Sequence, residues 1–144
     1  MKRDTARAII LTEDEKSIYL LYRKKKENNK LISYYAIPGG MIEKNETVEE
    51  AVKREIKEEF SVEVKLQGYL GKNKTKQGID YHYHAKIISG VPKLGGEEKE
   101  NNNEDNYYEI RKVTLKDLNK ENMNILPINI EYIEKALKKD YKKI

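Results

Sequence analysis

The sequence predicts a single mixed α/β (α+β) domain, in which a mixed β-sheet is combined with two substantial helices. Runs rich in Val, Ile and Tyr alternate along the chain with polar turns, which is typical of short strands. Two segments, residues 47–60 and 127–139, carry apolar residues at helical spacing. No internal repeat and no linker divides the 144 residues, so we expect one domain over residues 1–144 that buries ~70% of its unfolded surface.

Six strands are expected in this domain. They cover residues 6–12, 17–23, 31–40, 62–71, 79–90 and 107–114. The first two are joined by the acidic turn 13–16 and are predicted to pair as a hairpin. Pro38-Gly39-Gly40 breaks the third strand, and a polar turn at 72–78 separates the fourth from the fifth. Residues 91–106 contain Gly, Asn and acids and almost no apolar residue, which predicts a long surface loop.

The first helix is predicted to follow Thr47, because Thr47 and Glu50 have the spacing of a capping box. A short turn is expected at residues 115–118. The second helix should run from about Pro127 to Lys139, where Ile130, Ile133, Ala136 and Leu137 recur at helical spacing.

Composition excludes several classes of site and location. The chain has no Cys, which excludes disulfides and thiolate chemistry and favours a reducing, cytoplasmic compartment. With only two His, any metal site must use oxygen ligands, which suit Mg²⁺ or Mn²⁺. No apolar run approaches the ~18 residues of a membrane span, and the N-terminus lacks the apolar core of a signal peptide. The formal charge is +4, but 25 acids are interleaved with 29 bases, which disfavours nucleic acid as a partner.

The first helix has acids on the side that should face the core. With Val48 at zero and ~100° per residue, Ala51, Val52 and Ile56 form an apolar stripe. Glu55 falls at about −20° and Glu59 at about +20°, inside this stripe, and Glu58 lies at its edge near −80°. The opposite face of the helix carries Glu50, Lys53 and Lys57.

Three acids on one side of a helix repel one another unless a cation compensates them. A divalent cation would do so directly, as at phosphate-cleaving sites. The alternative is that the acids pair with Lys or Arg from a neighbouring element and have no further role. Three features favour the metal: the i, i+3, i+4 spacing, the preceding Pro-Gly-Gly turn, where backbone can approach a ligand, and the adjacent Arg54, placed to orient a carboxylate.

These residues resemble the signature of a known family. Gly40, Glu46 and the run 54–62 (REIKEEFSV) match the Nudix box GX5EX7REUXEEXGU, in which U is a bulky aliphatic residue. Every charged position is kept over the 23 residues from Gly40 to Val62. The likeness extends to the opening strand with Arg7, the second strand ending in Arg23, and the closing strand, turn and helix. The chain is thereby identified as a member of the Nudix (MutT-like) hydrolase family.

The resemblance implies an α/β/α sandwich around a mixed sheet and hydrolysis of a pyrophosphate bond in a nucleoside diphosphate linked to another moiety. It implies that the divalent cations, Mg²⁺ or Mn²⁺, are held by Glu55, Glu58 and Glu59, with the Gly39 carbonyl as a further ligand. Arg54 and Glu46 would brace the loop and helix. The sequence departs from the box at Ser61, which replaces a helix-ending glycine at a cost of ~1 kcal/mol.

The general base stays open, because family members take it either from the box or from a later loop. Glu55 is the candidate within the box. The candidates in the loop are Glu97, Glu98, Glu100 and Glu104, for each of which a solvated surface acid is the alternative.

Two arginines are candidates for substrate binding. Arg23 ends a strand and could hold a terminal phosphate, or it could cap a basic surface run; the case for Arg7 is weaker. In the run Tyr81-His82-Tyr83-His84, alternation places both Tyr on one face of a strand and both His on the other. One pair should pack in the core, while the other could stack on a base or titrate; a zinc site would lack a third ligand.

Two functions follow from different classes of protein. The first is a metal-dependent pyrophosphohydrolase that acts on a small nucleotide-type substrate, with no membrane partner and with a homodimer left open. The second is a catalytically silent Nudix-like module that binds nucleotides or RNA through its basic ends. The three kept acids favour the enzyme, because a module without turnover has no reason to hold repelling acids on an apolar helix face.

Overall fold

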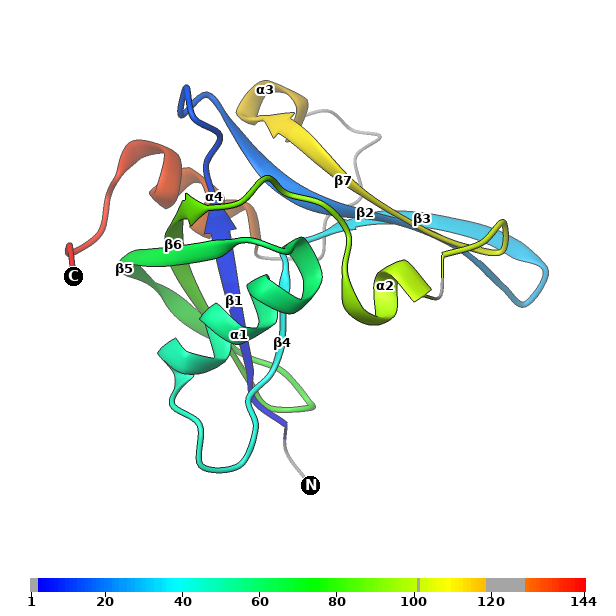
Figure 1. The fold of residues 1–144 in the computed structure, drawn as a ribbon, viewed down its shortest axis with the longest axis horizontal. Coiled ribbons are helices and arrows are strands. Elements are labelled where there is room, and N and C mark those ends of the chain that lie inside the picture. The colour runs from blue at the N-terminus through cyan, green and yellow to red at the C-terminus, as the bar shows by residue number, and fades with distance from the viewer. Residues whose placement is uncertain (1–2, 101, 119–128) are drawn as a thin grey trace.

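The computed structural model describes residues 3–100, 102–118 and 129–144, except for the side chains of Glu97, Glu98 and Asn129. Figure 1 shows the arrangement of strands and helices. The strands are β1 (Thr5–Ile10), β2 (Ser17–Glu27), β3 (Lys30–Ala36), β4 (Gly39–Met41), β5 (Glu63–Lys74), β6 (Ile79–Ser89) and β7 (Asn106–Thr114). The helices are α1 (Val48–Phe60), α2 (Gly96–Glu100), α3 (Leu115–Leu118) and α4 (Asn129–Lys138).

The strands form two sheets where the sequence predicted one. The first sheet has the order β4-β1-β6-β5 and is mixed, because β1 runs parallel to β6 and antiparallel to β4. The second sheet, β3-β2-β7, is antiparallel. The mixed α+β class is therefore confirmed, and the single sheet is replaced by two.

The predicted hairpin between residues 6–12 and 17–23 forms only next to its turn. Apart from the turn, the two strands meet only at one bridge, Leu11 to Ile18, and then enter different sheets. The physical reason is that each strand finds longer partners elsewhere: β1 pairs with β6 over six positions and β2 with β7 over nine. The tight turn therefore joins the two segments by a single bridge, and most of each strand pairs elsewhere.

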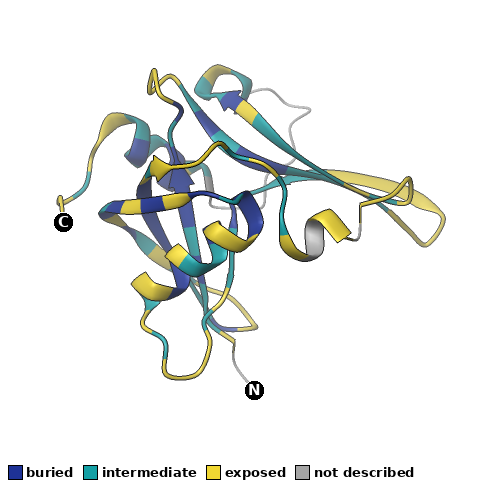
Figure 2. Ribbon diagram, in the orientation of Figure 1, coloured by how far each residue is buried: buried dark blue, intermediate teal, exposed yellow. Residues whose placement is uncertain are grey.

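Helices α1 and α4 cover opposite sides of the strands. Ala6, Ala8 and Ile10 of β1 pack with α1, whereas Ile9 packs with α4. Strands of both sheets contribute to each apolar layer, and Figure 2 shows the buried residues concentrated where helices meet strands. This is the α/β/α sandwich that the resemblance implied.

Helix α1 begins and ends as its sequence predicts. Thr47 is the N-cap and forms the reciprocal capping box with Glu50. Ser61 is the C-cap and has a left-handed backbone, with φ 60° and ψ 29°, at the position where the family signature has Gly. The sequence predicted that a non-glycine residue at this helix end is strained, and the left-handed backbone of Ser61 agrees with that prediction.

The loop prediction for residues 91–106 needs one correction, because five of its residues form the short helix α2. The segment before α2 is tied to the end of α1 by backbone hydrogen bonds from Lys93 to Phe60 (3.0 Å) and from Gly95 to Glu59 (2.9 Å). The start of the last predicted helix, residues 127 and 128, lies outside the described residues. No helix in the described ranges is long and apolar enough to cross a membrane.

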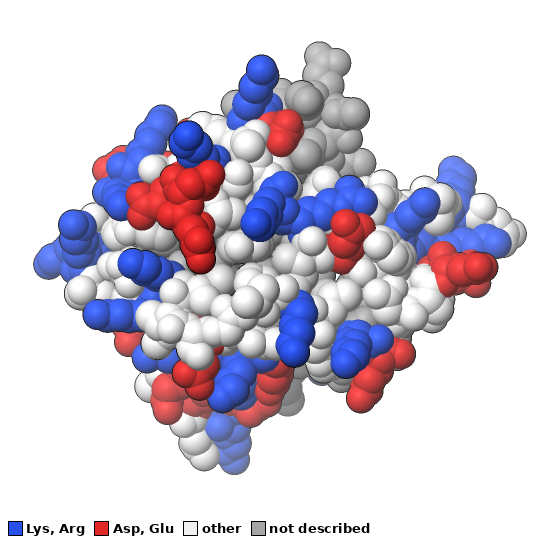
Figure 3. Space-filling view, turned by 45° about the horizontal axis from the view of Figure 1, so that its top comes forward, with Lys and Arg blue, Asp and Glu red and all other residues white. Residues whose placement is uncertain are grey.

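Acidic and basic side chains are mixed on one face of the molecule. On the face drawn in Figure 3, Lys and Arg side chains lie among Asp and Glu side chains and do not form one continuous stripe. This distribution agrees with the interleaving in the sequence.

Candidate active site

The acids of α1 lie as the helical projection predicts. Glu59 is 6% exposed and packs among the buried residues of the helix. The Glu55 side chain is 15% exposed, and that of Glu58, at the edge of the stripe, is 55% exposed. One side of α1 therefore presents carboxylates that range from buried to open, next to a fully apolar surface.

Arg54 connects these acids to the loop before the helix. Its Nε donates to Glu46 Oε2 at 2.6 Å, and its Nη2 donates to Glu46 Oε1 at 3.0 Å and to the Met41 carbonyl at 2.9 Å. Its Nη1 donates to Glu55 Oε1 at 2.9 Å and to Glu58 Oε2 at 3.3 Å. The brace predicted for Arg54 and Glu46 is thus present in the geometry, and it reaches two of the three candidate metal ligands.

Glu46 also fixes the shape of the loop. Its Oε1 accepts a hydrogen bond from the backbone N–H of Glu43 at 3.0 Å. The hydrogen bond from Arg54 is the main reason that the pKa of Glu46 lies below its ordinary value. A carboxylate held ionised in this way keeps both oxygens available as acceptors, so the loop and the helix stay joined.

The two glycines before the helix bring backbone against functional groups. A Cβ on Gly40 would lie 2.5 Å from the carboxyl carbon of Glu55, and a Cβ on Gly39 would lie 2.2 Å from the Ala6 carbonyl oxygen. Gly39 also has a φ of +147°, which side-chain-bearing residues rarely adopt. Only glycine permits this close approach, which sets the Glu55 carboxylate directly on the backbone of β4.

The donors of this site fit a hard divalent cation by chemistry. Carboxylate and carbonyl oxygens are the ligands that Mg²⁺ and Mn²⁺ prefer. Within the described part of the chain, no three His, Asp or Glu side chains are already gathered as a ligand set. Instead, Arg54 supplies the positive charge to Glu55 and Glu58. A divalent cation bound by Glu55 and Glu58 would share these two carboxylates with Arg54 or displace its guanidinium from them.

The loop acids lie on a segment that packs against the same end of α1. A Cβ on Gly95 would come within 2.5 Å of the Glu58 carbonyl oxygen, and α2 follows immediately. Glu100 is the last residue of α2, and Glu104 lies in the turn before β7. The side chains of Glu97 and Glu98 lie outside the description.

Arg23 lies on the α1 side of β2. Alternation puts its side chain on the same face as Leu21, which packs with α1. Its guanidinium donates to the Tyr34 hydroxyl at 3.1 Å and to Asn106 Oδ1 at 3.2 Å, and it lies 4.9 Å from the centre of the Tyr108 ring. The guanidinium of Arg23 is thus held between polar and aromatic groups, on the side of the sheet where the acids of α1 lie.

Arg7 is not brought to this side. It alternates along β1 with Ala6 and Ala8, which face α1, so its side chain leaves the strand on the other face. There its Nη1 donates to the Ile37 carbonyl at 2.9 Å.

The Tyr and His of β6 divide between the two faces as predicted. Tyr83 belongs to the α1 layer, whereas His82 stacks on Tyr132 of α4 at 4.5 Å. The His84 Nδ1 shares a hydrogen bond with the Tyr141 hydroxyl. His82 is covered by Tyr132 and His84 by Tyr141, so both histidines pack on the α4 side of the sheet, away from the acids of α1.

Sequence reasoning missed Glu43 and the group that holds Arg23. Glu43 Oε1 lies 3.6 Å from Arg54 Nη1, close enough for an ion pair. Tyr34, Asn106 and Tyr108 surround Arg23 only because β3 and β7 both pair with β2, at the register positions opposite Arg23 and its neighbours. Strand pairing over 83 residues of separation leaves no local signal in the sequence.

Comparisons with known proteins agree on one family. The family model of the NUDIX domain matches residues 1–132. An ADP-ribose pyrophosphatase of Methanocaldococcus jannaschii is 37% identical over 89 residues, which cover 62% of this chain and 51% of that protein. The match thus spans about half the length of this relative.

Solved structures show the same fold. A MutT NUDIX hydrolase from Burkholderia pseudomallei superposes with a TM-score of 0.70 at 22% identity, covering 93% of this chain and 97% of that one. An ADP-ribose pyrophosphatase from Streptococcus suis has a TM-score of 0.66 at 18% identity, with coverage of 99% and 94%. At such identities the likeness bears on the fold alone.

Proposed function

The chain belongs to the Nudix family, and from this premise we propose that it is a pyrophosphohydrolase that uses Mg²⁺ or Mn²⁺. Its substrate is a nucleoside diphosphate linked to another moiety. The observation that carries the proposal is the Arg54 network, because it holds Glu46, Glu55 and Glu58 on one side of α1 beside the Gly40 backbone. The lack of Cys supports a cytoplasmic location.

Under this proposal Glu55, Glu58 and Glu59 hold the cation, with the Gly39 carbonyl as a further ligand. A bound divalent cation would acidify the attacking water and offset charge on the pyrophosphate. Arg54 keeps Glu55 and Glu58 aligned, while Glu46 anchors Arg54. Glu59 is 6% exposed, so its carboxylate is the most buried of the three.

The reaction adds water to phosphorus and breaks one P–O bond of the anhydride. The general base takes the proton from water, and the bridging oxygen leaves with its electron pair on the second phosphate. Glu55 or one of the loop acids Glu97, Glu98, Glu100 and Glu104 is the base. Arg23 binds a substrate phosphate on the α1 side of β2, with Tyr34 and Asn106 orienting its guanidinium.

The test is hydrolysis of a compound panel by the purified protein. We expect release of phosphate-bearing products in Mg²⁺ or Mn²⁺ from at least one nucleoside triphosphate, nucleotide sugar or dinucleoside polyphosphate. The relative's printed activity makes ADP-ribose the first compound to try. Inertness across the panel, together with RNA binding that weakens steeply with salt, would favour the silent binding module instead.

Glu58→Gln is the decisive variant. Glu58 is exposed, so the amide should leave the fold intact while removing a charged ligand, and hydrolysis should fall by about a hundredfold or more. Glu49→Gln is the matched control, because Glu49 is an exposed acid of the same helix away from Arg54. Equal activity of the two variants would contradict the assignment of Glu58.

A further inference from the structure

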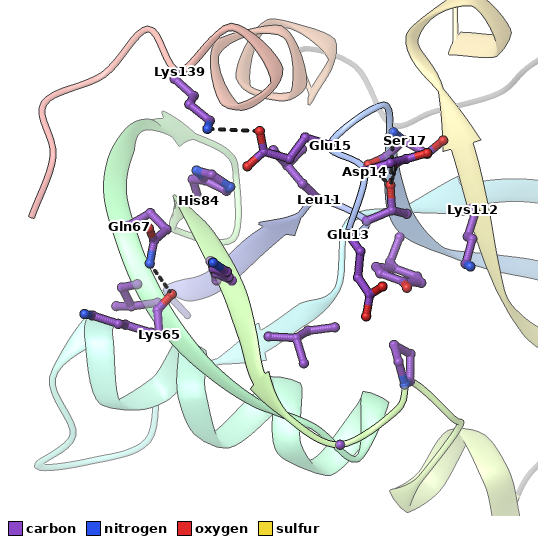
Figure 4. A pocket seen from close by; sticks show the side chains of 18 of the residues that line it. Leu11, Glu13, Asp14, Glu15, Ser17, Lys65, Gln67, His84, Lys112 and Lys139 are labelled. Carbon is purple, nitrogen blue, oxygen red and sulfur yellow. Dashed lines mark hydrogen bonds and ion pairs between the residues drawn. The ribbon is translucent and has the colours of Figure 1, made fainter.

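A pocket of about 780 Å³ lies away from the acids of α1. Figure 4 shows it between the turn after β1, the end of β6 and the segment after α4. Neither Arg54 nor any of the three candidate metal ligands lines it. The strand-to-loop segment Gly90–Pro92 forms one wall, and Lys93 next to it is bonded to the end of α1.

The pocket exists because the paired strands differ in length. The last register pair of β1 and β6 is Ile10 with Ala85, yet β6 continues to Ser89. After Ile10 the chain turns into β2 of the other sheet, so the sheets separate beside residues 86–89. Leu11 and Tyr141, which belong to the layer on the α4 side, line this space on the same face of β6 as Lys86 and give it an apolar wall.

Basic side chains outnumber acidic side chains in this pocket, and the last residue of the chain, Ile144, also lines it. Its lining includes five lysines, Lys65, Lys86, Lys112, Lys139 and Lys143, and three acids, Glu13, Asp14 and Glu15. Glu15 pairs with Lys139 at 3.0 Å, so these two charges offset each other. Asp14 accepts a hydrogen bond from the Thr12 hydroxyl at 2.7 Å and keeps its negative charge.

Two of the lysines face each other without compensation. Lys65 and Lys86 are direct register partners in the antiparallel pair β5–β6. Like charges at such positions destabilise a sheet. Among residues 3–100, 102–118 and 129–144, the structure records no ion pair for either side chain. An anion between them would relieve a repulsion that the folded protein otherwise carries.

We propose that this pocket binds a phosphorylated small molecule, at a site separate from the one that hydrolyses substrate. The lysines hold the phosphate, and the apolar wall at Leu11 and Tyr141 packs against the organic part. The volume falls within the ~300–1,000 Å³ typical of small-molecule sites. Binding at this pocket does not depend on the proposed hydrolysis, because none of the acids of α1 lines it.

The test is titration of ¹⁵N-labelled protein with AMP, in EDTA to prevent turnover, followed by amide shifts. We expect saturable shifts at Glu13, Lys86 and Ile87. The double variant Lys65→Ala/Lys86→Ala should weaken AMP binding about fivefold or more. Both lysines are exposed, so the variant should keep its fold, which circular dichroism checks.

The control removes the same charge elsewhere. Lys53→Ala/Lys57→Ala takes two exposed lysines from α1, and AMP binding at the pocket should change less than about twofold. Lys143→Ala is a second pocket variant and should also weaken binding. Equal weakening by the two double variants, shifts that never saturate, or shifts confined to α1 would each overturn the proposal.

Discussion

Arg54 joins more partners than any other described side chain of the candidate site. Its three nitrogens contact four carboxylates and one carbonyl, from Met41 to Glu58. The planar guanidinium suits this role, because its donors point in fixed directions and can bridge several oxygens. A lysine has one charged nitrogen and could not hold both the loop and the helix.

Arg54→Ala should therefore lower the free energy of unfolding by about 2–4 kcal/mol, because it leaves clustered acids without a cation. Urea unfolding in the absence of divalent cations measures the change. Lys57→Ala is the control on the same helix: it removes the exposed pair of Lys57 with Glu63, which should be worth less than about 1 kcal/mol. Similar losses in both variants would show that the Arg54 network is no more than a surface ion pair.

At the scale of elements, helix α1 is determined at both ends by its own sequence. The capping box begins it, and Ser61 ends it with a left-handed backbone. The N–H of Ser61 still bonds to the Lys57 carbonyl at 3.0 Å, so the helix end is satisfied despite the missing glycine. The cost of Ser61 is then conformational and is not a lost hydrogen bond.

Ser61→Gly should raise the free energy of unfolding by about 0.5–1 kcal/mol, because glycine adopts this backbone without steric cost. Thermal or urea unfolding gives the value. Ser89→Gly is a control at an exposed position of β6, where glycine should not raise the free energy of unfolding. A loss of stability in Ser61→Gly would mean that the hydroxyl itself has a structural role.

At the scale of the whole molecule, the segment after α4 closes the layer opposite α1. Tyr141 lies against Gly68, and its hydroxyl shares a hydrogen bond with His84. Burial, with a further contribution from Lys139, lowers the pKa of His84 from 6.5 to about 4, while Glu15 acts in the opposite sense. The folded protein thus keeps a neutral histidine where the unfolded chain would protonate it.

Stability should fall as the pH drops from about 6.5 to about 4, because in this window the unfolded state binds one more proton than the folded state. The melting temperature at about pH 5 should be lower than at about pH 7, and His84→Gln should reduce this difference. An unchanged difference in the variant would assign the pH dependence to other groups.

The parts of the molecule that were predicted correctly depend on short-range properties. The positions of Glu55, Glu58 and Glu59 around α1 follow from helical geometry, and the start at Thr47 follows from one capping pair. The family signature is also local, since it lies within 23 consecutive residues. The opposite faces taken by Tyr83 and His84 follow from the period of a strand.

Strand partners, the surroundings of Arg23 and the lysine-lined pocket could be seen only in the folded chain. Each depends on which distant segments pack together, and that choice is made by the burial and hydrogen bonding of all strands at once. The turn between β1 and β2 was locally suited to a hairpin, yet longer pairing with β6 and β7 outweighed it. The sequence alone determines helix caps, helix faces and the family signature, because these depend on residues close together in the chain. The tertiary structure decides the partner of each strand, because all strands of the chain compete for pairing.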